Sequence, residues 1–412
     1  MAVPKTGKKT TKIGLILLAF VAFIALGMPD GLLGVGWPSI RAGFGIPLDS
    51  LGMLLIASMT GYLTSSFLSG KLIARLGVGG LLVASCAATG VGLIGYTLVP
   101  VWGMMVALGV IAGLGAGAID AGLNTYVAAN FGEGLMQWLH ASYGIGVTLG
   151  PIIMTVALNT LSSWRVGYAV VGGFQLALAA CFMLTLPMWT QKSHPADAEK
   201  PKRLTDYKTS LRETLRRPQV WLSVSLFFLY TGGEVSLGTW AYTLLTEGRG
   251  IDPRVAGLWA GSYWLMFTIG RILAGLYARR IPGRLLVQLS LLGALLGSGL
   301  VWWNLSPGVS LAGVALIGFA IAPIFPAMVS GTSQRVGARF AANTIGMQMG
   351  AASLGASLIP GLVGVLAKNI SLEVIPICLF VLFAALLGAH LIASRRPEAA
   401  AAPEEHLAPV EL

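Results

Sequence analysis

Residues 70–80 read Gly-Lys-Leu-Ile-Ala-Arg-Leu-Gly-Val-Gly-Gly, a short basic segment between two apolar runs. A related segment, Gly-Leu-Tyr-Ala-Arg-Arg, occupies residues 275–280, 205 positions later and again directly after an apolar run. Asp30-Gly-Leu-Leu-Gly34 is matched in the same way by Glu234-Val-Ser-Leu-Gly238, at an offset of 204. The shared offset predicts two parallel repeats, an arrangement typical of transporters built from two halves.

The composition places these repeats in lipid. Of 412 residues, 55% are hydrophobic and only 10% are charged, and the mean hydropathy is +0.79. Apolar runs of about 20 residues, enough to cross a bilayer, lie at 13–37, 50–70, 81–99, 102–128, 137–160, 167–187, 219–245, 254–278, 285–304, 310–332, 341–367 and 372–393. We therefore expect an all-α polytopic membrane protein with twelve transmembrane helices in two pseudo-symmetric six-helix bundles.

The basic residues predict the orientation. With twelve spans, 21 Lys and Arg residues fall on the face that carries both termini, against five on the opposite face. The positive-inside rule makes the first face cytoplasmic. The net charge of +11 then reflects topology, and no nucleic-acid partner is expected. We expect a multi-pass monomer in the plasma membrane, most simply a bacterial inner membrane, with the bilayer as its surroundings.

The same pattern divides the chain into five parts. We predict a cytoplasmic tail at 1–12, an N-terminal bundle at 13–187, a cytoplasmic inter-bundle loop at 188–218, a C-terminal bundle at 219–394 and a disordered tail at 395–412.

Ionisable residues inside predicted spans are the main functional signal. Three acids, Asp30, Asp120 and Glu234, and one cation, Arg271, lie well inside apolar runs, away from the residues at the run ends. A charge at mid-bilayer costs about 2.5–3.5 kcal/mol even on lenient insertion scales, so it faces a wet cavity, finds a partner or is protonated. The acids are therefore candidates for carrying a coupling proton. A structural pair between Glu234 and Arg271 is the alternative for Glu234.

Residues 70–80 resemble the loop between helices 2 and 3 of the major facilitator superfamily, normally Gly-x-Leu-Ala-Asp-Arg-x-Gly-Arg. Ala74 replaces the usual Asp and Gly79 replaces a basic residue. The resemblance covers essentially the whole chain and implies alternating access between two bundles. The arginines expected to act in gating are Arg75, Arg271, Arg279 and Arg280.

A closer resemblance concerns the fucose–galactose–glucose proton symporters and their glucose-transporter relatives. Asp120-Ala-Gly-Leu-Asn124 is similar to their acid-x-x-x-Asn element, Asp30 stands where they have an acid in helix 1, and residues 140–151 resemble their helix 5 signature. The resemblance implies that Asp120 and Asp30 divide proton transfer and sugar recognition. It also implies that Asn124 holds a sugar hydroxyl.

The predicted binding set combines hydrogen-bonding and aromatic side chains near the pseudo-symmetry axis. A sugar hydroxyl left unpaired in a dry site costs roughly 1–3 kcal/mol, so a sugar site needs many polar partners. For each Gln or Asn, interhelical hydrogen bonding is an equal alternative, and for Trp240 so is an interfacial position. The predicted substrate-binding residues are Asp30, Asn124, Gln137, His140, Tyr143, Glu234, Trp240, Tyr263, Trp264 and Gln348.

These residues favour proton-coupled symport of a monosaccharide or similar polyol. A drug–proton antiporter is the first alternative, because residues 146–151 partly match the Gly-x-x-x-Gly-Pro element of exporters; an uncoupled sugar facilitator is another. No phosphate loop, nucleophile motif or metal-ligand spacing appears, so neither an enzyme nor a metal site is expected. The proton is the only coupling ion expected, and no cofactor is.

Overall fold

A computed structural model of the chain describes residues 6–130, 133–189, 209–277 and 280–395, and helices without strands make up this part. The first half contains α1 (Thr6–Phe44), η1 (Leu48–Ser50), α2 (Leu51–Leu98), α3 (Trp102–Asn130), α4 (Glu133–Leu161), α5 (Trp164–Leu184) and η2 (Leu186–Met188). The second half contains α6 (Leu211–Leu215), α7 (Pro218–Thr243), η4 (Leu244–Gly248), α8 (Pro253–Tyr277), α9 (Gly283–Trp303), α10 (Pro307–Ile321), α11 (Ile324–Ser330), α12 (Thr332–Val336), α13 (Ala338–Asn369) and α14 (Val374–Arg395).

The helices match the predicted spans. Within the described residues, ten stretches are long and apolar enough to cross a membrane, and they overlap eleven of the twelve predicted spans. One stretch, Leu48–Leu98, holds two of those spans, since α2 runs through both of them. The helix is interrupted between the two spans at Gly77, where φ is +69°. The remaining predicted span, 254–278, coincides with α8. The all-α membrane fold is confirmed, whereas the count of twelve crossings is matched only in part.

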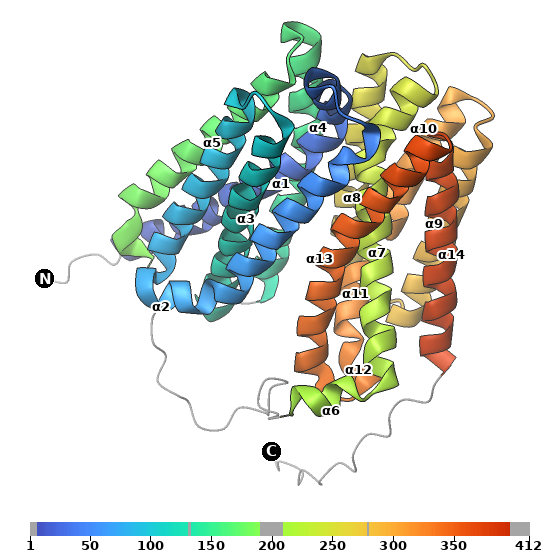
Figure 1. The fold of residues 1–412 in the computed structure, drawn as a ribbon. Coiled ribbons are helices and arrows are strands. Elements are labelled where there is room, and N and C mark those ends of the chain that lie inside the picture. The colour runs from blue at the N-terminus through green and yellow to red at the C-terminus, as the bar shows by residue number, and fades with distance from the viewer. Residues whose placement is uncertain (1–5, 131–132, 190–208, 278–279, 396–412) are drawn as a thin grey trace, which may run out of the picture.

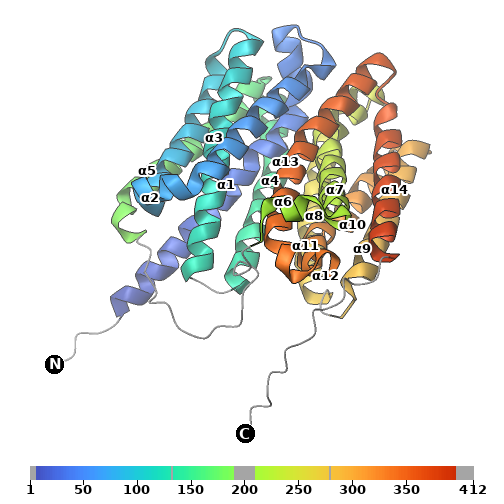
Figure 2. The ribbon, with the colours of Figure 1, turned by 60° about the horizontal axis from the view of Figure 1, so that its bottom comes forward.

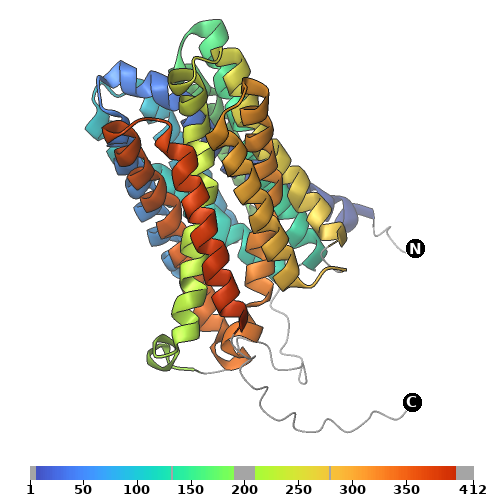
Figure 3. The ribbon, with the colours of Figure 1, turned by 90° about the vertical axis from the view of Figure 1, so that its right-hand side faces the viewer.

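The two halves form separate bundles that lie side by side (Figure 1). In the first bundle α2 packs on α3 and α5, and α1 packs on α4. In the second, α13 packs on α7 and α14 lies against both α7 and α9, as Figure 3 shows from the side. The bundles contact each other through α4 with α8, α2 with α13 and α1 with α7. The beginning of α1 and the end of α14 lie at the same side of the molecule (Figure 2), called here the terminus side; the opposite side is the distal side.

The predicted division of the chain can be compared with these helices only in places. α1 begins at Thr6, so helix extends into the predicted tail at 1–12. Most of the predicted inter-bundle loop and the tail beyond Arg395 lie outside the described residues. The boundaries of the five parts therefore stay predictions.

Glycines bring α1 and α4 into backbone contact in the first bundle. A Cβ atom added at Gly146 would overlap the carbonyl oxygen of Ile24, and one at Gly31 would overlap that of Val147. Membrane helices associate through small residues at such points, because lipid provides no hydrophobic driving force between helices. This close packing fixes the faces of α1 and α4 that carry Asp30 and Tyr143.

The bundles meet on the distal side and diverge toward the terminus side (Figure 1). On the distal side, Arg41 at the end of α1 pairs with Glu247, and Lys368 in α13 pairs with Asp49 at 3.0 Å. Gly34 of α1 lies against the backbone of Gly238 in α7. The two ion pairs, called here the distal ion pairs, therefore join the halves on the side where the bundles are closed.

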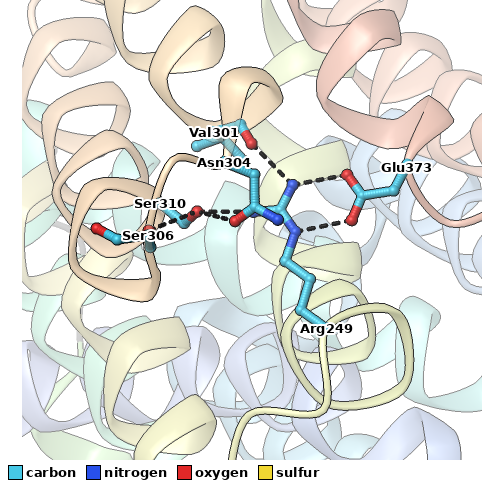
Figure 4. A network of polar contacts seen from close by, with 6 residues as sticks. All are labelled: Arg249, Val301, Asn304, Ser306, Ser310 and Glu373. Atoms are coloured by element: carbon cyan, nitrogen blue, oxygen red, sulfur yellow. Dashed lines mark hydrogen bonds and ion pairs between the residues drawn. The ribbon is translucent and has the colours of Figure 1, made fainter.

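A buried arginine fixes the segment that carries one of these acids (Figure 4). The Arg249 side chain is 5% exposed, and its Nε and Nη2 donate to the two Glu373 carboxylate oxygens at 2.8 and 2.7 Å. Its Nη1 donates to Ser310 Oγ at 2.9 Å, and Nη2 also donates to the Val301 carbonyl at 2.7 Å. A bidentate arginine adds geometric specificity to its charge. The network therefore ties the loop after η4, two residues beyond Glu247, to α9, to α10 and to the turn that precedes α14.

Candidate transport site

Asp30 and Tyr143 form the first polar contact of the site. Asp30 lies inside α1 directly after Pro29, and Tyr143 lies in α4. The Tyr143 hydroxyl donates to Asp30 Oδ2 at 2.6 Å. Asp30 is solvent-exposed although residues before and after it, among them Met28 and Leu32, are buried. The structure therefore brings these two predicted site residues together, at an accessible position of α1 between buried neighbours.

Asp120 in α3 forms a second polar cluster. Asn124, one helical turn later, donates from Nδ2 to Asp120 Oδ1 at 2.9 Å. Tyr62 of α2 donates its hydroxyl to the other carboxylate oxygen, Oδ2. His140 of α4 is exposed, packs edge-on against Phe23, and interacts electrostatically with Asp120. Asp120, Asn124 and His140 are thus brought together, with the Asn124 Oδ1 atom buried and unpartnered.

The second bundle contributes an acid and a cation. Glu234 in α7 is 9% exposed and interacts electrostatically with Arg271 in α8. The two side chains, both described, do not form a direct ion pair; the Arg271 guanidinium instead lies 4.2 Å from the centroid of the Phe267 ring. Arg271 Nε is buried without a hydrogen-bond partner. A charge left incompletely paired inside a membrane protein is a candidate functional group.

Two side chains of α4 connect the clusters across the bundle interface. Tyr143 interacts electrostatically with Glu234 and Arg271 as well as with Asp30. His140 interacts with both Asp120 and Arg271. Tyr62 likewise interacts with Asp30. Charged and hydroxyl groups from α1, α2, α3, α4, α7 and α8 therefore form one electrostatic cluster, which supplies both donors and acceptors.

Three predicted binding residues are used for packing in the second bundle. Trp240 is fully buried, and its Nε1 donates to the Pro360 carbonyl at 2.9 Å. Trp264 lies against the backbone of Gly238. The Tyr263 hydroxyl donates at 2.7 Å to the main-chain carbonyl of Glu234, so it supports the helix that carries this acid.

Gln348 lies in a separate buried network. Its side chain is fully buried, and Nε2 donates to Ser223 Oγ at 2.7 Å and lies 3.1 Å from Thr332 Oγ1. The structure does not bring Gln348 to Asp30 or Asp120. The binding roles given to Gln348 and to the aromatic residues stay predictions.

The predicted gating arginines occupy different surroundings. Arg75 and Arg280 are exposed on the terminus side, where the bundles are apart, and Arg271 lies in the cluster. Arg279 lies outside the described residues, as does the side chain of Gln137.

Tyr62 is the site residue that sequence reasoning missed. It lies in a polar stretch of the second span, with Thr60, Thr64, Ser65 and Ser66 close by. Hydroxyl residues crowded into one transmembrane run are the signal that would have pointed to it, since most of that run would otherwise be apolar.

Comparison with known proteins identifies relatives over most of the chain. Residues 15–360 match the family model described as Major Facilitator Superfamily. The sodium-dependent glucose transporter 1 of Homo sapiens is 25% identical over 389 residues, covering 84% of this chain and 72% of the relative. The glucose/mannose transporter GlcP of Bacillus subtilis is 22% identical over 358 residues, covering 85% of this chain and 87% of the relative.

Solved structures share the fold. A D-xylose-proton symporter superimposes with a TM-score of 0.74 at 17% identity, covering 94% of this chain and 98% of that one. A bacterial homologue of the human lysosomal transporter Spinster, in an inward-facing and occupied conformation, gives a TM-score of 0.73 at 14% identity, covering 95% and 98%.

Proposed function

The chain belongs to the Major Facilitator Superfamily, and on that premise we propose that it carries a monosaccharide across the membrane by proton-coupled symport. In this proposal the two bundles rock about the cluster of acids and tyrosines, so that the cluster is open to one side of the membrane at a time.

The observation that carries the proposal is the pairing of exposed Asp30 with Tyr143, beside the Asp120 cluster. Carboxylates accept hydrogen bonds, whereas tyrosine and histidine both donate and accept them. A sugar presents hydroxyl groups that also donate and accept, so this set matches its chemistry. The glucose and glucose/mannose transporters among the relatives support the same substrate class.

Coupling of sugar transport to protons is a separate part of the proposal. Asp30, Asp120 and Glu234 lie inside membrane helices, where a carboxyl group is a proton carrier by its chemistry. The D-xylose-proton symporter supports this at the level of a shared fold. Sodium coupling is the competing possibility, because several relatives are named sodium-dependent.

We also propose which side of the molecule faces the cytoplasm. By the distribution of basic residues the terminus side is cytoplasmic, so the conformation closed by the distal ion pairs is inward-facing. Arg75, Arg279 and Arg280 would then close the cytoplasmic side when the halves rock, by bonding helix C-termini of the opposite bundle. The bilayer of the plasma membrane is the proposed location.

Counterflow of labelled D-glucose into proteoliposomes loaded with unlabelled D-glucose tests the substrate class, because it requires no ion gradient. We expect accumulation of label that unlabelled D-mannose or D-xylose competes away. Uptake that occurs in sodium buffer but not in choline buffer would identify sodium, and not the proton, as the coupling ion. Movement of a lipophilic cation, without movement of any sugar, would support the exporter alternative instead.

A further inference from the structure

Tyr62 stands between the two acid clusters of the first bundle. Its hydroxyl donates to Asp120 Oδ2, and Tyr62 also interacts electrostatically with Asp30. Tyr143 makes the corresponding bond to Asp30. Each acid therefore has its own tyrosine, and Tyr62 is the one whose surroundings include both acids.

The hydrogen bonds of Asp120 depend on its charge. An ionised carboxylate accepts only, and here one oxygen accepts from Tyr62 and the other from the Asn124 amide. A proton placed on Oδ1 would face the amide hydrogens of Asn124, donor against donor. A proton placed on Oδ2 instead faces the Tyr62 oxygen, which can accept it.

Protonation at Oδ2 reverses the contact with Tyr62. The Asp120 hydroxyl then donates to the Tyr62 oxygen, and the Tyr62 hydrogen leaves the bond it made before. No proton is lost in the step: one is added to Asp120 from water, and the tyrosine proton stays on its oxygen but turns outward. Because charge-assisted bonds are roughly twice as strong as neutral ones, Tyr62 is also held less tightly afterwards.

We propose that Tyr62 is the positioning residue that couples protonation of Asp120 to sugar binding. With Asp120 ionised, the Tyr62 hydroxyl hydrogen is hydrogen-bonded to the carboxylate. With Asp120 protonated, the same hydrogen is free to donate to a sugar hydroxyl held near Asp30. This inference rests on the proposed function and adds to it the residue through which the proton acts.

The charged neighbours define what else titrates there. His140 from α4 interacts with Asp120, Asp30 from α1 interacts with Tyr62, and Arg271 from α8 interacts with His140. His140 is the neighbour whose ordinary titration falls near neutral pH. A variant that removes the Asp120 charge is therefore needed to distinguish protonation of Asp120 from protonation of His140.

The test measures D-glucose affinity of the purified full-length protein at about pH 6 and about pH 8. For wild type we expect tighter binding at low pH by about tenfold, the size of one hydrogen bond gained. Tyr62→Phe should still bind D-glucose but should change affinity less than about twofold between the two pH values. Asp120→Asn should lose the pH dependence too. Tyr96→Phe, which removes a buried hydroxyl elsewhere in α2, is the matched control and should behave as wild type.

Each other outcome overturns the inference. If Tyr62→Phe weakens binding equally at both pH values and keeps the tenfold ratio, Tyr62 is only structural. If Asp120→Asn keeps the ratio, His140 or another group carries it. If wild type binds D-glucose without pH dependence, no such coupling exists. If wild type binds neither D-glucose, D-mannose nor D-xylose, the proposed function fails, and the inference falls with it.

Discussion

Neutralising both distal ion pairs should shift the protein toward the conformation open on the distal side. Arg41 and Glu247 are 27% and 31% exposed, and Lys368 and Asp49 are 41% and 26% exposed. Both pairs join the first half to the second, so both exist only while the distal side is closed. The double variant Glu247→Gln/Asp49→Asn removes the two attractions without changing side-chain size.

The magnitude follows from the exposure of the pairs. Ion pairs at this level of exposure contribute about 0–1 kcal/mol each, since solvent screens them. Two pairs together therefore contribute at most about 2 kcal/mol, which changes the ratio of distal-closed to distal-open protein by up to about 30-fold. The effect should shrink at high ionic strength, because salt screens exposed charges.

Distances between spin labels at Leu161 and Val255 measure this ratio. Both residues are exposed, at 62% and 41%, and lie at the distal ends of α4 and α8, which belong to opposite halves and pack together. The labels require a background in which Cys86, Cys181 and Cys378 are replaced. We expect the double variant to gain a population of long distances that is nearly absent in wild type.

Two further variants make the measurement decisive. The charge swap Arg41→Glu/Glu247→Arg should keep the short distance of wild type, because the attraction is rebuilt with its partners exchanged and the Lys368–Asp49 pair is intact. Glu213→Gln removes an ion pair to Arg339 that lies wholly within the second half, and it should leave the distances unchanged. An unchanged distance distribution in the double variant, or the same shift in Glu213→Gln, would show that the distal ion pairs do not hold the distal side closed.

Three other perturbations have definite expectations. Arg249→Met should lower the free energy of unfolding by about 1–3 kcal/mol, because buried Ser310 and the Val301 carbonyl lose their hydrogen-bond donor and half-exposed Glu373 loses its bidentate partner; a melting temperature equal to wild type would contradict this. Gly146→Ala should destabilise by about 1–3 kcal/mol through overlap with α1, whereas Gly173→Ala, which meets open space, should be neutral or slightly stabilising in the same thermal assay. Tyr143→Phe should weaken D-glucose binding about tenfold, and unchanged affinity would remove its hydroxyl from the site.

The fold was largely readable from the sequence because lipid imposes strong constraints. Apolar runs of spanning length, a repeat offset and asymmetric basic loops each report on helices and their order. The two predicted spans 50–70 and 81–99 lie on either side of Gly77, where the positive φ of a glycine interrupts α2. The contacts between halves were out of reach, because partners such as Arg41 and Glu247 are 206 positions apart and no local pattern links them.

The site residues that could be predicted from the sequence are mainly the charged ones. An acid in an apolar run has few explanations, so Asp30 and Asp120 stood out, and each is found hydrogen-bonded to a tyrosine. Tyr62 is neutral and amphipathic, so in a sequence it looks like any interfacial aromatic residue. Trp240 lies six positions after Glu234, roughly 240° around the helix, and its own packing could be known only from the neighbouring α13.

Proton symport is tested most directly by sugar-driven proton movement into proteoliposomes that carry a pH-sensitive dye, with wild type compared with Asp120→Asn. We expect D-glucose added outside to acidify the lumen with wild type, while Asp120→Asn still exchanges labelled D-glucose but moves no protons. Glucose entry without acidification in wild type, or acidification that survives in Asp120→Asn, would contradict proton symport through Asp120.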